Sequence, residues 1–396
     1  MFASRVSVLG SVLALAASLV CLGACSGNAQ SVADYEGDAY PNRRPKLESP
    51  GHVLGYLANR FSDSISVVDL DERRLVGSAP VGRDPVDIDG PRHVVLDRAA
   101  RLAYVVYSYP NSNISPHASS LGTNGRLGYV AALDLTDLSP LGELRLDVSP
   151  GDLALSGSGR LAISHFDTLK ALDTTSIESR RANVALVQPA TALARSQASA
   201  SRVSVCAVPA AIAFGADGSR LFVACMGEDS LAVVDAETAS VIARVPAGDI
   251  AVNQPYALVR NMTGDRLLLS NQVAGTVVQF SSDDTPQVLS IARFTEVPFF
   301  AEFVSEREFV VALQNPDGSA RVELASGTVL MKKSYSETEC VKPTQPRQLA
   351  DGRLFLICQG DGHSPGALVE LDPATLAIQT RIEVGVWPER MEILEP

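Results

Sequence analysis

Five histidines are the first candidates for chemistry, because imidazole titrates near neutral pH and is a common metal ligand. No HxH or HExxH spacing occurs, so a metal site would need distant loops to converge. The GxSxG, phosphate-loop and dinucleotide-binding motifs are also absent. We therefore expect no metal and no cofactor. The histidines are His52, His93, His117, His165 and His363.

The N-terminal region contains an apolar segment that ends at a cysteine. Arg5 precedes the stretch Val6 to Val20, which is too short and too rich in small residues to span a membrane stably. The residues Leu22-Gly23-Ala24-Cys25 resemble the lipobox of bacterial lipoproteins, in which the cysteine thiol receives a diacylglycerol. The resemblance implies a signal peptide over residues 1–24 and lipidation of Cys25. An ordinary cleaved secretory signal is the alternative.

Residues 25–50 are rich in Ser, Gly, Asn, Asp and Pro and lack an apolar period, which predicts a flexible tether. Ser26 is not the Asp that retains many lipoproteins at the inner membrane. The sequence thus favours a cell-envelope protein attached by its lipid, most simply to the outer membrane.

The overall charge of −12 argues against nucleic-acid binding. No run of Lys and Arg extends beyond Arg43-Arg44. The hydrophobic content of 46% is sufficient for a folded core.

Internal repetition is the main feature of residues 51–396. The unit contains an apolar strand, a short polar turn and a second apolar strand that often ends in Asp. Examples are 56–59 with 65–69, 221–225 with 231–235, and 354–358 with 367–372. This pattern resembles the YVTN-type, WD-like propeller repeats of bacterial surface-layer-like and periplasmic proteins. The resemblance implies an all-β propeller of four-stranded antiparallel blades.

Prolines mark the start of the other half of each unit and allow the blades to be counted. They recur every 43 to 59 residues, and proline suits the first residue of a strand because it has no N–H to donate. The last one, Pro388, precedes a single strand, whereas the strand at 56–59 has none before it. We therefore expect seven blades, closed by the C-terminal strand joining the N-terminal blade. The prolines are Pro91, Pro150, Pro209, Pro255, Pro298, Pro343 and Pro388.

Four cysteines are predicted to form two disulfides, as expected in an oxidising compartment. Cys206 and Cys340 each lie three residues before a repeat proline, and Cys225 and Cys358 each end an apolar strand. Because the start of the first strand and the end of the second are neighbours, we expect intra-blade bonds Cys206–Cys225 and Cys340–Cys358. The absence of CxxCH excludes covalent c-type haem.

The ends of the second strands place one residue per blade near the top of the channel: Asn59, Tyr107, His165, Cys225, Asn271, Leu313 and Cys358. Together with adjacent loop residues they supply the candidate ligand-facing set. Asp167 could assist His165 as a base or could simply cap its own loop. The candidates are Asn59, Arg60, Tyr107, His117, His165, Asp167, Asn271 and His363.

Two long insertions, 108–128 and 166–182, are expected side by side on the top face, while a third, 188–201, extends the opposite face. The first hypothesis is therefore a non-enzymatic, membrane-tethered scaffold that binds an envelope protein or polymer through the top loops, as a monomer. The alternative is a propeller hydrolase similar to lactonases, using His165 with Arg60 or Arg83. A redox-partner protein that docks a periplasmic cytochrome is the third hypothesis.

Overall fold

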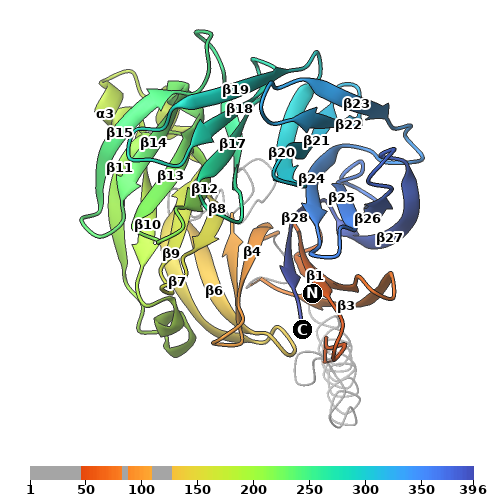
Figure 1. The fold of residues 1–396 in the computed structure, drawn as a ribbon. Coiled ribbons are helices and arrows are strands. Elements are labelled where there is room, and N and C mark those ends of the chain that lie inside the picture. The colour runs from red at the N-terminus through yellow and green to blue at the C-terminus, as the bar shows by residue number, and fades with distance from the viewer. Residues whose placement is uncertain (1–45, 83–87, 109–126) are drawn as a thin grey trace, which may run out of the picture. The chain divides into compact units, whose positions relative to one another are not determined.

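The computed structural model describes residues 46–82, 88–108 and 127–396. Their strands form seven four-stranded antiparallel sheets arranged as blades around an axis (Figure 1). We name the strands of each blade A to D. The A strands of neighbouring blades contact one another around the whole ring, so strand A is innermost. The predicted seven-bladed propeller is confirmed.

Each blade runs from strand A at the axis to strand D at the rim. Blade 1 contains β28 (Pro388–Leu394), β1 (Leu54–Asn59), β2 (Ser64–Asp69) and β3 (Arg74–Pro80). Blade 2 contains β4 (Pro91–Asp97), β5 (Leu102–Tyr107), β6 (Leu127–Asp134) and β7 (Pro140–Val148). Blade 3 contains β8 (Pro150–Leu155), β9 (Leu161–His165), β10 (Arg181–Val187) and β11 (Ala200–Ala207). Blade 4 contains β12 (Pro209–Phe214), β13 (Arg220–Cys225), β14 (Ser230–Asp235) and β15 (Ser240–Pro246).

Blade 5 contains β16 (Pro255–Arg260), β17 (Arg266–Asn271), β18 (Thr276–Ser281) and β19 (Val288–Arg293). Blade 6 contains β20 (Val297–Phe303), β21 (Glu308–Gln314), β22 (Gly318–Glu323) and β23 (Val329–Ser334). Blade 7 contains β24 (Pro343–Gln348), β25 (Leu354–Cys358), β26 (Pro365–Leu371) and β27 (Ile378–Val386).

The ring is closed by β28, which is strand A of blade 1. It pairs antiparallel with β1, with Leu394 opposite Leu54 and Met391 opposite Leu57 (Figure 1). The Met391 side chain is fully buried in the core between blades 7 and 1. The predicted closure is confirmed, and it leaves neither end strand of the ring as an open edge.

Apolar side chains from neighbouring blades interlock to form a core at every blade interface. Strands β1 and β5 are buried along their whole length, whereas the outer strand β3 is mostly exposed. A strand enclosed on both faces must be apolar throughout, which explains the continuous apolar runs of strand B.

The aspartates at the ends of the C strands have a structural role. Asp69 Oδ1 accepts hydrogen bonds from the backbone N–H groups of Asp71 and Glu72. Asp235 and Asp372 likewise accept hydrogen bonds from the backbone N–H groups two and three residues further along the chain. These Asx turns connect strands C and D.

The insertions of blade 3 are ordered. Insertion 166–182 contains η2 (Lys170–Leu172) and α3 (Ile177–Arg180), and insertion 188–201 contains η3 (Ala190–Arg195). The Leu193 side chain of η3 is buried in the core between blades 2 and 3. Most of the predicted insertion 108–128 lies outside the described residues. A short 3-10 helix, η4 (Met226–Glu228), follows β13.

The described unit begins at Lys46, somewhat earlier than the predicted propeller boundary. Leu47 is buried, and its N–H donates to the carbonyl of Thr136. Residues 46–50 therefore pack with the propeller. No helix of the described residues has the length and apolar character needed to cross a bilayer.

Candidate functional site

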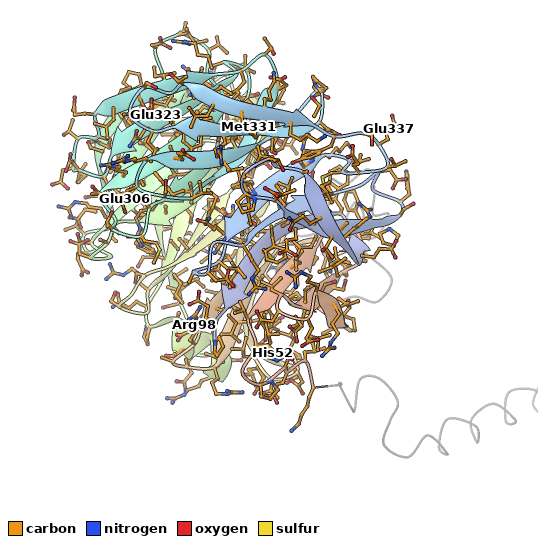
Figure 2. All side chains as sticks on the ribbon, turned by 45° about the vertical axis from the view of Figure 1, so that its right-hand side comes forward. His52, Arg98, Glu306, Glu323, Met331 and Glu337 are labelled. Carbon is orange, nitrogen blue, oxygen red and sulfur yellow. A yellow bond between two sulfur atoms is a disulfide. The ribbon has the colours of Figure 1, made fainter. Side chains whose placement is uncertain are left out.

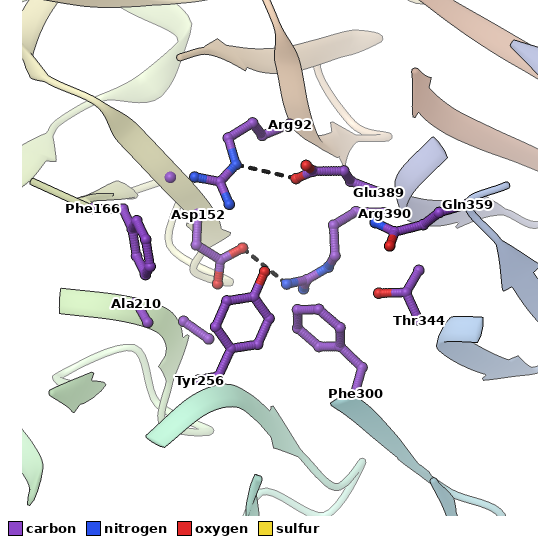
Figure 3. Close-up of a pocket in the computed structure, with 12 residues that line it drawn as sticks. Arg92, Asp152, Phe166, Ala210, Tyr256, Phe300, Thr344, Gln359, Glu389 and Arg390 are labelled. Atoms are coloured by element: carbon purple, nitrogen blue, oxygen red, sulfur yellow. Dashed lines mark hydrogen bonds and ion pairs between the residues drawn. The ribbon is translucent and has the colours of Figure 1, made fainter. Parts of the chain in front are cut away.

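A cavity at one end of the axis is lined mainly by the first residues of the A strands (Figure 3). It is narrow: the space in which the centre of a water molecule fits measures about 30 Å³. The lining side chains come from strands of different blades, so they converge only once the ring has closed. We call this cavity the axial pocket; its lining residues are Arg92, Gly151, Asp152, Phe166, Ala210, Ala211, Tyr256, Phe300, Thr344, Gln359, Glu389 and Arg390.

The backbone around each strand-A proline directs these side chains to the axis. The residue before the proline has a left-handed conformation in most blades, with φ of 51° at Ser149, 51° at Val208 and 56° at Trp387. Directly after the proline the register with strand B shifts, as in blade 3 between Pro150 and Leu153. Such bulges turn the side chains of a strand away from their regular alternation.

Glu389 is a carboxylate of the pocket wall and is held by two arginines. Its Oε1 accepts a hydrogen bond from Arg60 Nη1 at 3.0 Å, and its Oε2 accepts one from Arg92 Nε at 3.1 Å. Burial opposes ionisation, but Arg92 and Arg60 outweigh it and lower the pKa of Glu389. Glu389 is therefore ionised at neutral pH, and each of its oxygens has a second lone pair with which to accept a hydrogen bond.

Asp152 forms a second, more enclosed ion cluster. Its Oδ1 lies 3.0 Å from Arg390 Nη1 and 2.7 Å from His93 Nδ1, and its Oδ2 accepts the N–H of Ile212 at 2.9 Å. Burial raises the pKa of Asp152, yet Arg390 and His93 outweigh burial and bring it to about 2. Burial and Arg390 lower the pKa of His93, so His93 is neutral at pH 7.

Three guanidinium groups of this region each lie over a phenylalanine ring. The distances from the guanidinium carbon to the ring centroid are 5.6 Å for Arg60 over Phe61, 5.5 Å for Arg92 over Phe166, and 4.1 Å for Arg390 over Phe300. Stacking keeps a guanidinium plane fixed while leaving its N–H edge free to bind.

Tyr256 completes an aromatic wall with Phe166 and Phe300, the rings on which Arg92 and Arg390 stack. Its ring packs edge-on against Phe166 and Phe300, with centroids 6.3 Å and 6.0 Å away (Figure 3). Burial raises the pKa of Tyr256, so the phenol keeps its proton and can donate a hydrogen bond. The pocket thus combines a charged wall from blades 1 to 3 with an aromatic wall from blades 3, 5 and 6, as suits a small polar ligand with one apolar face.

Three further charges lie four residues after the prolines of blades 6, 7 and 1. Arg347 Nη1 donates to Glu392 Oε2 at 3.1 Å, and Arg347 Nε lies 3.9 Å from Glu302 Oε1. Burial is the main cause that raises the pKa of Glu302 to about 6. Since side chains two residues apart on a strand share a face, Glu392 lies beyond Arg390 on the same side of β28. We call these three residues the lower layer.

The predicted ring of strand-B ends does not line the axial pocket. Asn59, Tyr107, His165 and Asn271 are all buried within the blades, with at most 2% of each residue exposed. Asn271 Nδ2 donates to Thr276 Oγ1 and to the carbonyl of Ala247. The interpretation as ligand-facing residues was wrong because strand B is the second strand from the axis, where side chains enter the interfaces between blades.

His165 is not part of a catalytic pair with Arg60. Its Nδ1 lies 2.7 Å from the carbonyl oxygen of Asn183, and burial lowers its pKa. Asp167 caps the inserted loop by accepting the N–H of Lys170, as the second of its two interpretations predicted. Arg83 lies outside the described residues.

The other candidates have mixed outcomes. Arg60 does reach the pocket, through Glu389. His363 lies in the loop before β26, where its N–H binds Asp361. His117 lies outside the described residues. Among the described residues, one group has metal-binding geometry, His52 with Asp69 and Asp71, and none of its members lines the axial pocket.

Both predicted disulfides are present, with S–S distances of 2.08 Å for Cys206–Cys225 and 1.95 Å for Cys340–Cys358. The expected intra-blade placement is wrong for the first pair. Cys206 belongs to β11, strand D of blade 3, whereas Cys225 ends β13, strand B of blade 4. This bond therefore links two blades.

Most residues that form the pocket were not among the sequence-based candidates. The available signal was the dipeptide after each repeat proline, because Arg92-His93, Gly151-Asp152 and Glu389-Arg390 place charges at equivalent positions. The direction that these side chains share depends on the bulge after the proline, and no local residue type predicts that bulge. The left-handed residues before the prolines include Val208 and Trp387 and not only glycine.

Comparison with known proteins identifies the fold. No family model and no curated protein matches the chain. Among solved structures, the periplasmic gluconolactonase of Pseudomonas aeruginosa matches with a TM-score of 0.60 and 16% identity, over 87% of this chain and 100% of that chain. A putative 6-phosphogluconolactonase of Bacteroides fragilis matches with a TM-score of 0.61 and 12% identity, over 87% and 98%.

The dihydro-heme d1 dehydrogenase NirN, in complex with DHE, matches with a TM-score of 0.56 and 15% identity, over 88% of this chain and 77% of that chain. The shared property is the propeller fold. At these identities the likeness carries no residue assignment to this chain.

Proposed function

We propose that the protein is a lactonase-type hydrolase that opens a small sugar lactone in the axial pocket. The observation that carries this proposal is the position of Glu389, an ionised carboxylate of the pocket wall between stacked arginines. Two of the structural neighbours are named as lactonases, one of them as a putative one, which supports the same reaction class. Lactone hydrolysis needs a base for water and donors for a developing oxyanion, and the pocket holds both.

The reaction assigns one role to each charged group. Glu389 takes a proton from a water molecule while the water oxygen bonds to the lactone carbonyl carbon. Arg92 and Arg390 stabilise the oxyanion of the tetrahedral intermediate. When the ring C–O bond breaks, the departing oxygen takes the proton back from Glu389, and the product hydroxy acid ionises in solution.

Asp152 serves as a positioning residue in this scheme. Both of its oxygens are already occupied by Arg390, His93 and a backbone N–H, and its pKa of about 2 makes it a weak base. It fixes the Arg390 guanidinium over Phe300. Glu389 is the better base because each of its oxygens accepts only one described hydrogen bond.

Base titration of acid release from a panel of neutral and anionic sugar lactones, D-glucono-1,5-lactone among them, tests the proposal. We expect Glu389→Gln to reduce kcat/KM by roughly 10²- to 10⁴-fold, the usual contribution of a general base. Arg92→Met should reduce it by roughly 10²- to 10³-fold, because it removes one oxyanion donor. Glu383→Gln, an exposed glutamate on β27, is the matched control and should retain full activity. Equal activity in Glu389→Gln and Glu383→Gln, or no acid release by the wild-type protein from a panel of sugar lactones, would refute the proposal.

We also propose that the protein acts in the cell envelope, attached by a lipid on Cys25. The lipobox-like residues before Cys25 support this, and they lie outside the described residues. Cys25→Ser should move the protein from the membrane fraction to the soluble fraction; an unchanged distribution would refute lipid anchoring. The top-face scaffold and the cytochrome-docking role stay predictions.

A further inference from the structure

The charged wall of the axial pocket offers more hydrogen-bond donors than the described residues use. Arg60, Arg92 and Arg390 each carry five N–H donors. The Nε atoms of Arg60 and Arg390 are buried and have no hydrogen-bond partner among the residues that the structure describes. A buried donor without an acceptor is costly, and Arg390, which lines the pocket, is therefore suited to a further anion.

Glu389 occupies the position that such an anion would take. Its two oxygens bind guanidinium groups that project from blade 1 and blade 2, as the oxygens of a free carboxylate or phosphate would do. The side chain of Glu389 lines the axial pocket and keeps 11% of its surface exposed.

We propose that the substrate carries an anionic group, a carboxylate or a phosphate, which replaces Glu389 on Arg60 and Arg92 and releases Glu389 to act as the base. This inference rests on the proposed lactonase function and names the substrate class of the same site.

The two arginines remain neutralised when one anion replaces another on them. Phe61 and Phe166 hold the two guanidinium planes in place throughout. The released Glu389 carboxylate loses both arginine partners, a cost that the contacts of the incoming anion must offset. Burial, which already opposes its ionisation, then raises the pKa of Glu389 and makes it a stronger base than in the free protein.

The lower layer explains why the anion would stay at the upper end of the channel. Glu302 and Glu392 accompany a single arginine there, Arg347. This acidic layer repels an anion that moves deeper along the axis. The reactive carbonyl is thereby kept beside Arg92 and Arg390, the two groups assigned to the oxyanion, at the level of the aromatic wall.

Calorimetric titration with inorganic phosphate and, separately, with gluconate tests the exchange. Because Glu389 competes with the added anion, Glu389→Gln should bind one of these probes at least tenfold more tightly than the wild-type protein. Glu383→Gln should bind like the wild type. Arg60→Met, which removes one of the two partners, should lose at least tenfold in affinity and provides a second readout. A response to phosphate indicates a phosphate-bearing substrate, whereas a response to gluconate alone shows that the arginines bind a carboxylate, a group that the product of lactone opening also carries.

The outcomes separate this inference from the proposed function. Unchanged or weaker anion binding in Glu389→Gln overturns the exchange, even if that variant loses lactone hydrolysis. Tighter anion binding in Glu389→Gln, together with no lactone hydrolysis by the wild type, supports the anion site and overturns the lactonase proposal. Anion binding that is insensitive to Arg60→Met overturns the assignment of the site. Thermal unfolding of each variant confirms that it is folded before titration.

Discussion

Two sets of equivalent residues lie one strand apart at the same end of the blades. The starts of the A strands carry Arg92, Asp152 and Glu389, whose charges face the axis. The ends of the B strands are their direct neighbours, since Pro150 pairs with His165 and Pro255 with Asn271. Adjacent strands are separated by only about 4.8 Å, yet one set forms the pocket and the other joins the blades.

The B-strand ends join the structure through several kinds of bond. Asn59 and Asn271 donate hydrogen bonds to the first residue of strand C. Cys225 and Cys358 form disulfides with the segments that lead into strand A. The comparison shows that the strand a residue occupies decides its role more than the end of the blade at which it lies.

Removal of the closing strand β28 should disrupt both the starts of the A strands and the ends of the B strands. This is the largest effect we expect. A chain lacking residues 388–396 has no Glu389 or Arg390, and it exposes the inner edge of β1 and the core that Met391 fills. We expect no cooperative thermal transition by circular dichroism or calorimetry. Met391→Asp, which places a charge in the same core, should be strongly destabilising as well. A truncated protein that unfolds at the wild-type temperature would contradict the closure.

Loss of a disulfide should distinguish the B-strand ends from the A-strand starts. It should lower the stability of the fold and leave the activity of the axial pocket unchanged. The Cys206–Cys225 bond closes a loop with a sequence separation of 19. Cys206→Ala with Cys225→Ala should therefore lower the free energy of unfolding by about 3 kcal/mol in urea titrations. The kcat/KM for lactone hydrolysis should stay within about twofold of the wild type. Cys340→Ala with Cys358→Ala is the matched pair, and a large fall in kcat/KM in either double variant would show that the B-strand ends act on the pocket.

Acid should reveal the contribution of the A-strand starts to stability. Asp152 has a pKa of about 2 in the folded protein, below its ordinary value of 3.8. Its stabilising effect is therefore complete above about pH 4 and is lost as the pH falls towards 2, a total of about 2 kcal/mol. In Asp152→Asn this part of the acid dependence should disappear. Urea unfolding at pH 6 and at pH 3 measures the difference, and parallel losses in the wild type and in Asp152→Asn would contradict the role of Asp152.

The sequence was sufficient to predict the blades because each one repeats a pattern set by burial. Continuous apolar runs mark strand B, Asp residues such as Asp235 mark the turn after strand C, and prolines such as Pro209 mark strand A. The pairing of Leu394 with Leu54 followed from counting strands. These features depend on local residue types and on their period, both of which a single sequence displays.

The pocket was harder to predict because it depends on the direction in which side chains of the A strands point, and the period of the sequence repeat does not show that direction. The register shift between Pro388 and Arg390 decides which side chains of β28 face the axis. The partners of Glu389 are 297 and 329 residues away in the chain, and no motif connects them. Cys206 was paired correctly, but its blade was not, because the sequence does not show that strand β11 continues to Ala207.

The side chains drawn in Figure 2 show how the outer surface of the blades differs from the axial pocket. Among the labelled residues, Glu306 lies in the turn between β20 and β21, Glu323 ends β22, and Glu337 follows β23 of blade 6. Charges there are spread over the surface and face solvent, whereas the charges of the axial pocket are enclosed and paired. Burial strengthens each ion pair of the axial pocket, so these few charged residues are the ones to which the proposed chemistry is assigned.

The placement of Glu389 and Arg390 on the closing strand also has a consequence for when the protein can act. A polypeptide that is still being synthesised has most of its blades but neither Glu389 nor Arg390. The proposed chemistry would then arise in one step, together with ring closure, so that partly made chains would have none of it. A protease that trims a few residues beyond Val386 would silence the same chemistry without touching the other six blades.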